Sequence, residues 1–208
     1  MSIELMKSRR SIRRFKSERP RREIIEQLIE AAITAPSASN KQPWRFLIVT
    51  NESIQRQLVE SIQAAVNRIA SHVEPGFEEA FRAYGDYFTR FENAPVLIVP
   101  LCRPMHLLSR MVDEKLEPLD RTAISNMEER SGVVSISLAI QNILLRTHEL
   151  GLGASGMTGP LIAGDDLRKI LKVPDSWEIV AFIPVGFPDE QPNPKPRKPI
   201  DAVVKWLE

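Results

Sequence analysis

Residues 9–15 have the sequence Arg-Arg-Ser-Ile-Arg-Arg-Phe, and residues 35–44 have the sequence Ala-Pro-Ser-Ala-Ser-Asn-Lys-Gln-Pro-Trp. The first stretch places four arginines and one hydroxyl within seven residues. Arginine binds phosphate through paired donors, and a serine hydroxyl adds a short donor that adjusts to phosphate geometry. The second stretch offers small hydroxyls, an amide pair and an aromatic ring, which suit a flat heterocycle. Together the two stretches predict a site for a phosphorylated cofactor.

At these residues the chain resembles the FMN-dependent nitroreductase family, whose pattern is Arg-Arg-Ser-x-Arg-x-Phe, a helix, and Ala-Pro-Ser-x-x-Asn-x-Gln-Pro-Trp. The resemblance continues in order through residues 141–145, 149–153 and 195–199, so that it covers nearly the whole length. It implies an α+β fold with a central sheet flanked by helices. It also implies an intertwined homodimer, in which a single FMN-binding domain over residues 1–208 ends in an extended tail, 188–208, that crosses to the partner.

The resemblance further implies which residues hold FMN. Five side chains would bind its phosphate, namely Arg9, Arg10, Ser11, Lys195 and Arg197. Arg13 is the candidate cation beside the part of the ring that gains negative charge on reduction. The other side of the ring would be held by a clamp from the second subunit, formed by Pro36, Ser37, Ser39, Asn40 and Gln42. A stretch that allows close approach of the backbone would lie along the flavin, and it consists of Met157, Thr158 and Gly159. Solvated tail charges at 195 and 197, and a plain turn at 157–159, are the alternative interpretations.

The activity implied by the resemblance is hydride transfer from NADH or NADPH to a nitroaromatic, quinone or similar electron-poor small molecule, in a ping-pong cycle. No side chain stands out as an acid or base, so no catalytic residue is assigned. The three histidines, His72, His106 and His148, have no metal-ligand spacing, and no metal is expected. The alternative is a flavin-binding or flavin-modifying protein of the same fold with a specific non-nitro substrate.

Composition indicates the cellular compartment of the protein. A chain of 208 residues buries roughly 70% of its unfolded surface without needing a disulfide or metal. The single cysteine, Cys102, cannot form an internal disulfide, which favours a reducing compartment. No apolar run approaches the ~20 residues that span a bilayer, and the N-terminus lacks the apolar core of a signal peptide. We therefore expect a cytoplasmic protein with no membrane partner.

Charge is distributed unevenly along the chain. Residues 1–22 carry nine cations against two carboxylates, a net +7, so the overall +1 leaves −6 for the remainder. A basic arm of this kind also occurs in nucleic-acid-binding proteins and in mitochondrial addresses, or as a solvated charge run with no role. Phe15 is the arm's one aromatic residue and the body has no basic face, so no nucleic-acid partner is expected.

Hydrophobic spacing predicts the main elements. We expect helices from Pro20 to about Thr34, after a cap at Ser53, around Phe77–Phe88, over 133–150 and over 165–171, with strands over 45–50, 96–101 and 178–185. Residues 102–131 show no regular pattern and predict a mobile segment with short helices. The helix over 133–150 is apolar almost all round, which predicts burial partly against a second subunit. Gly151 follows this helix and precedes a strand, so Gly-x-Gly-x-x-Gly at 151–156 indicates a helix C-cap rather than a dinucleotide-binding turn.

Overall fold

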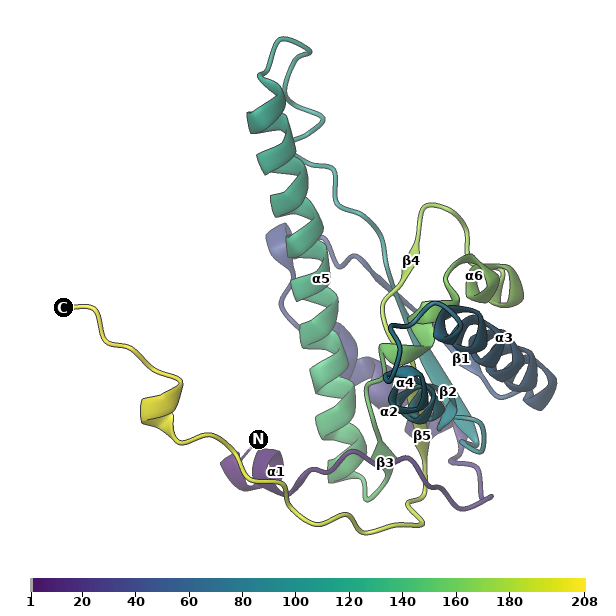
Figure 1. Cartoon of the computed structure of the whole chain (residues 1–208). Coiled ribbons are helices and arrows are strands. Elements are labelled where there is room, and N and C mark those ends of the chain that lie inside the picture. The colour runs from purple at the N-terminus through teal and green to yellow at the C-terminus, as the bar shows by residue number, and fades with distance from the viewer. Residues whose placement is uncertain (1) are drawn as a thin grey trace.

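The apolar runs of the chain pair into one antiparallel sheet, as a computed structural model describing residues 2–208 shows (Figure 1). The strand order is β1-β2-β5-β3, with β4 beside β2. The strands are β1 (Trp44–Val49), β2 (Val96–Cys102), β3 (Gly153–Ala154), β4 (Glu178–Ile179) and β5 (Ile183–Gly186). Every residue of β2 is buried, as expected for a central strand covered on both faces.

Two helical layers cover the sheet. The first contains α2 (Arg22–Ile33) and α5 (Pro118–Glu149), which pack together against one face. The second contains α3 (Glu52–Ala70) and α6 (Asp165–Leu171), whose apolar side chains share a separate core with the other face. Figure 1 shows the sheet between these layers. The expected α+β fold with helices on both faces is confirmed.

The remaining elements are short. They are α1 (Ile3–Ser8), α4 (Glu78–Gly85), and the 3-10 segments η1 (Ala38–Asn40), η2 (Asp86–Thr89), η3 (Gly159–Ala163) and η4 (Ile200–Ala202). The chain after β5 is extended, and every residue from 193 to 208 is exposed. In Figure 1 this C-terminal segment leaves the body beside α1 and ends far from the sheet.

The prediction for residues 102–131 was wrong over its second half. The long helix α5 begins at Pro118, a residue suited to the first turn, and continues to Glu149. Its N-terminal half rises beyond the sheet (Figure 1). Because this half packs against few elements, it needs no regular apolar stripe, and its periodicity is weak. Residues 103–117, between β2 and α5, form a loop, and the expected mobility of this segment stays a prediction.

Smaller corrections concern element ends and exposure. Asn51, and not Ser53, caps α3, because its side chain accepts hydrogen bonds from the backbone N–H groups of Ser53 and Ile54. The strand expected over 178–185 is interrupted and forms β4 and β5. Of the aromatic residues expected in the core, Phe77 and Tyr84 are each 66% exposed.

Candidate functional site

The N-terminal arm, residues 9–16, lies along the edge of the sheet and is held there by backbone hydrogen bonds. The Ile12 N–H donates to the Ala154 carbonyl at 3.0 Å, and the Lys16 N–H donates to the Phe187 carbonyl at 2.9 Å. The arm is therefore positioned by both β3 and the segment that follows β5.

Close packing at Gly153 sets the direction of the arm's side chains. Ile12 is buried, and a Cβ on Gly153 would lie 2.6 Å from its Cγ2 atom. Only glycine leaves room for this approach. Side chains alternate along an extended segment, so with Ile12 facing inward, Ser11 and Arg13 face outward, and both line a cleft.

This cleft, named here the cationic cleft, has a volume of about 990 Å³. It lies between the arm, residues 89–93 and residues 190–197. Its walls include all five side chains predicted to bind phosphate, together with Arg13, so the tertiary structure brings together Arg9, Arg10, Ser11, Arg13, Lys195 and Arg197. Residues almost two hundred positions apart thus form one positively charged surface.

Mutual repulsion among these cations is visible at Arg9. Partial burial, the Arg197 guanidinium and the Arg10 guanidinium together lower the pKa of Arg9. Burial disfavours the charged form, and neighbouring cations do the same. An anion placed among these three side chains would offset the repulsion and favour the charged form of Arg9. The cleft therefore has the electrostatics of an anion-binding site.

Glu190 is an acidic group in this cleft, and its carboxylate accepts hydrogen bonds from backbone N–H groups. Its Oε1 atom accepts a hydrogen bond from the Arg13 N–H at 2.5 Å and another from the Arg14 N–H at 3.0 Å. The carboxylate fixes the arm's backbone beside the tail. It thereby helps to position the two arginine side chains that extend from the same residues.

A histidine lies next to the cationic cleft. The Nε2 atom of His148, in the last turn of α5, is 2.8 Å from the Ser8 hydroxyl. Burial, Arg9 and Arg10 lower the pKa of His148. The imidazole is therefore electrostatically coupled to the predicted phosphate ligands.

Two residues of the predicted ring clamp, Pro36 and Ser37, line a second cleft. This polar–apolar cleft, of about 680 Å³, is lined by Pro36 and Ser37 on one side and by α5 on the other. The Ser135 hydroxyl of α5 accepts a hydrogen bond of 3.2 Å from the Ala38 N–H. Ser39, Asn40 and Gln42 are exposed and line neither cleft.

The backbone of the clamp is held in an unusual conformation. Ser39, Asn40 and Gln42 have φ angles of 50°, 51° and 47°. This left-handed region costs a non-glycine residue roughly 1–2 kcal/mol. The Ser37 hydroxyl supports the turn by accepting a 3.0 Å hydrogen bond from the Gln42 N–H. Such strain occurs often where a loop is preorganised for a ligand.

Residues 157–159 connect β3 to the start of η3. Met157 is buried and pairs with Phe182, while Thr158 is exposed at the start of η3. A Cβ on Gly159 would lie 2.1 Å from a ring carbon of Phe88. None of these three residues lines either cleft described above. Within one chain, the structure therefore brings the predicted phosphate ligands together but leaves the predicted clamp and residues 157–159 apart from them.

Sequence reasoning missed several lining residues. Arg90 lines the cationic cleft, with its guanidinium carbon 3.7 Å from the ring centre of Tyr87. No motif surrounds Arg90. Asn126 and Arg130 line the polar–apolar cleft, and the assignment of 102–131 as irregular concealed them. Their spacing of four residues was the available signal of one helix face.

Within residues 2–208, no group of three or more His, Cys, Asp and Glu side chains is arranged to hold a metal ion. None of the helices described there is long and apolar enough to cross a membrane.

Comparison with known proteins places this geometry in a family. The Nitroreductase family model matches residues 6–187. An iodotyrosine deiodinase from Thermotoga neapolitana is 30% identical over 204 residues, covering 98% of this chain and 96% of the relative. A putative NADH dehydrogenase/NAD(P)H nitroreductase from Methanothermobacter thermautotrophicus is 28% identical, covering 92% of this chain and 79% of the relative.

Solved structures agree with the sequence comparison. A BluB-like flavoprotein from Clostridium difficile superposes with a TM-score of 0.83 at 22% identity, covering 100% of both chains. An oxidized iodotyrosine deiodinase bound to FMN and 3-iodo-L-tyrosine superposes with a TM-score of 0.74 at 25% identity, covering 99% of this chain and 98% of the other. With the family match over most of its length, the chain belongs to the nitroreductase family.

Proposed function

We propose that the chain is an FMN-dependent oxidoreductase that acts as a homodimer. It takes reducing equivalents from NADH or NADPH and passes them to a nitroaromatic, a quinone or a similar electron-poor small molecule in a ping-pong cycle. The observation that carries this proposal is the cluster of Arg9, Arg10 and Arg197 around one cleft of about 990 Å³.

The residues of the cationic cleft suit the phosphate of FMN. A phosphomonoester carries roughly −1.5 to −2 charge at neutral pH. That charge would offset the repulsion by which Arg197 and Arg10 lower the pKa of Arg9. Ser11 lines the same cleft and adds a hydroxyl donor. The fit therefore rests on charge and on donor chemistry.

FMN, when bound, supplies the hydride chemistry, and the protein supplies position and electrostatics. Arg13 would hold a fixed positive charge beside the ring, which favours the form that carries extra negative charge. No acid or base is assigned to the chain, so protons would come from water. This allows broad tolerance for the acceptor.

Homodimer formation is supported by exposed apolar surface. Val133 of α5, which does not line the polar–apolar cleft, is 47% exposed, and Trp206 and Leu207 of the tail are 83% and 86% exposed. Large apolar side chains exposed on a protein surface commonly mark interfaces. In a dimer, the clamp at Pro36–Gln42 of one subunit would complete the flavin site of the other. This arrangement would explain why the clamp and the cationic cleft are separate within one chain.

A second candidate function is reductive removal of halogen from an aromatic substrate. It is favoured by the 30% identity to the Thermotoga neapolitana iodotyrosine deiodinase over almost the whole chain. Both candidates use the same cofactor site and differ in the molecule that accepts electrons.

Anaerobic mixing with each nicotinamide tests the proposal. The purified protein should be yellow, and either NADH or NADPH should bleach its long-wavelength flavin band. Reoxidation by a nitroaromatic or a quinone supports the first candidate, whereas halide release from a halogenated phenol supports the second. If neither donor bleaches the band, the oxidoreductase proposal fails and a flavin-modifying role becomes the better account.

A further inference from the structure

The side chains of α5 that line the polar–apolar cleft change from polar to apolar along the helix. Asn126, Arg130, Val134 and Leu138 follow one another at intervals of four residues and all line the cleft. This spacing places them on one helix face. The face is therefore polar toward the N-terminal end of α5 and apolar further along, where Pro36 and Ser37 stand opposite.

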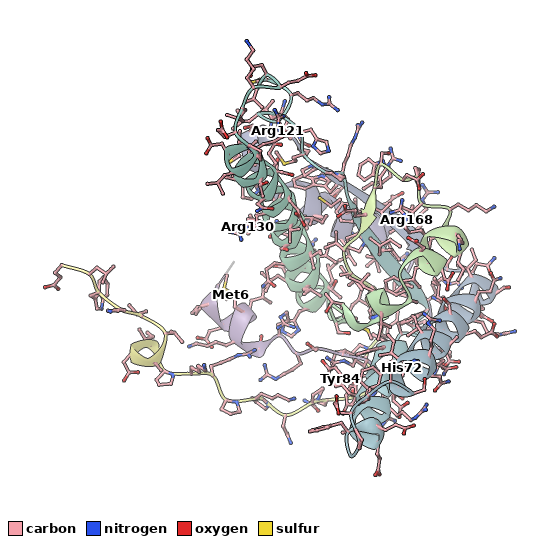
Figure 2. All side chains as sticks on the ribbon, turned by 45° about the horizontal axis from the view of Figure 1, so that its top comes forward. Met6, His72, Tyr84, Arg121, Arg130 and Arg168 are labelled. Carbon is pink, nitrogen blue, oxygen red and sulfur yellow. The ribbon has the colours of Figure 1, made fainter. Side chains whose placement is uncertain are left out.

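Arg130 is the one charged side chain among the cleft's lining residues in the described chain. It is exposed, and within residues 2–208 its guanidinium has no hydrogen bond or ion pair. Figure 2 shows it extending from α5 away from the sheet. The cleft thus contains a guanidinium whose five donors face solvent.

The other two arginines of α5 behave differently. Arg121 donates a 2.6 Å hydrogen bond to the Asp113 carbonyl. Arg146 contacts the Glu149 carboxylate at 2.6 Å and the Gln27 side chain at 2.7 Å. Their roles within the fold are evident from these contacts. Arg130 has no comparable structural role, and a planar fork is well suited to binding a carboxylate through two donors.

We infer that Arg130 binds the anionic group of the electron acceptor, and that the preferred acceptor is a flat, apolar molecule bearing a carboxylate. This inference rests on the proposed oxidoreductase function. The carboxylate would meet Arg130, with the Asn126 amide as a neighbouring donor. The flat body would lie along Val134 and Leu138 toward the clamp at Pro36.

Two nitroaromatic acceptors of similar shape and different charge test the role of Arg130. Para-nitrobenzoate and para-nitrobenzamide have nearly the same size, and only the first is anionic. The FMN-loaded wild-type protein should reduce the acid with a kcat/KM about tenfold higher or more, which corresponds to about 1.4 kcal/mol of selective binding. Arg130→Gln should abolish that preference by lowering the kcat/KM for the acid toward that for the amide. Arg130→Lys should retain part of it, and Arg68→Gln, at an exposed site on α3, should retain all of it.

Binding measured without turnover keeps the inference independent of the proposed function. Calorimetry with the wild-type protein and Arg130→Gln should show tighter binding of the acid only in the wild type, even if no donor bleaches the flavin. Equal affinity for acid and amide in the wild type would overturn the inference, and so would an unchanged preference in Arg130→Gln. Dissociation of the homodimer in Arg130→Gln would overturn it as well, because Arg130 would then bind a second copy of the chain. Failure of both NADH and NADPH to bleach the flavin band of the wild-type protein, by contrast, would refute only the proposed function.

Discussion

The Glu128 carboxylate on α5 accepts a hydrogen bond of 2.6 Å from the backbone N–H of Leu108 in the loop 103–117. The same oxygen accepts a second bond, at 2.5 Å, from the Leu107 N–H. Glu128 is 3% exposed, so the loop is fastened to the helix through a buried anion. Hydrogen bonding by Ser109 and these backbone groups lowers the pKa of Glu128, against the opposing effect of burial.

Replacing this carboxylate should loosen the loop. Glu128→Ala leaves several backbone donors without an acceptor, and unsatisfied buried groups are costly. We expect faster hydrogen exchange at Leu107 and Leu108 and a lower Tm, with Glu129→Gln, at the adjacent exposed position, as the control. Because the folded pKa lies below 4.5, the stabilisation is present above that pH and is lost as the pH falls through the folded pKa. Unchanged exchange would contradict the anchoring role.

His148 should report on FMN binding. Burial, Arg9 and Arg10 lower its pKa from 6.5, so its contribution to stability is complete above that pH and is lost as the pH falls below it. A bound phosphate offsets the two arginines, and the pKa of His148 should therefore rise when FMN is added. NMR titration measures this, with His72, which follows α3 and is well separated from Met6 in Figure 2, as the control. A His148 titration unaffected by FMN would place the phosphate elsewhere.

The arginines of the arm should be required for the flavin. Arg9→Ala combined with Arg13→Ala removes two cations from the cationic cleft, and the purified protein should be colourless. Arg68→Ala, outside both clefts, should remain yellow. The absorbance spectrum decides the matter, and full retention of flavin by the double variant would refute the assignment. Salt-dependent shifts of RNA or DNA without a chromophore would instead favour the nucleic-acid alternative.

Gly153→Ala should displace the arm. The added methyl would lie 2.6 Å from Ile12, and such overpacking typically costs about 1–3 kcal/mol. We expect a lower free energy of unfolding in urea and weaker FMN binding. Gly156→Ala is the matched control, since its nearest neighbour would be 3.9 Å away. Equal stability of the two variants would show that the arm adjusts freely.

The proposed dimer can be tested in solution. Sedimentation at micromolar concentration should give one species near twice 23.6 kDa. Val133→Asp places a charge on the exposed apolar face of α5 and should shift the species toward monomer. Deleting residues 188–208 should weaken both the dimer and flavin binding, because the tail carries Lys195 and Arg197. A flavin-loaded monomer of the intact chain would contradict the proposal, and a tail deletion without effect would make these two cations ordinary surface charges.

The sequence by itself determined the family, the α+β class and the elements that have strong local periodicity. The α2 helix is an example, since Ile25, Leu28 and Ala32 recur at helical spacing and are buried. That Arg9, Arg10, Ser11, Lys195 and Arg197 share one cleft was also predictable, because each of them lies in a recognisable motif, whereas their role as phosphate ligands stays a prediction. The single domain over 1–208, the crossing tail and the cytoplasmic location stay predictions.

The length of α5 and the separation of the two clefts depend on contacts between distant parts of the chain. The N-terminal half of α5 is anchored by Glu128 to backbone groups about twenty residues away, and such long-range contacts leave no periodic signal in the sequence. Ser37 and Arg130 meet in one cleft for the same reason. Local patterns specify which face of an element is buried, whereas packing against distant segments specifies which side chains become neighbours.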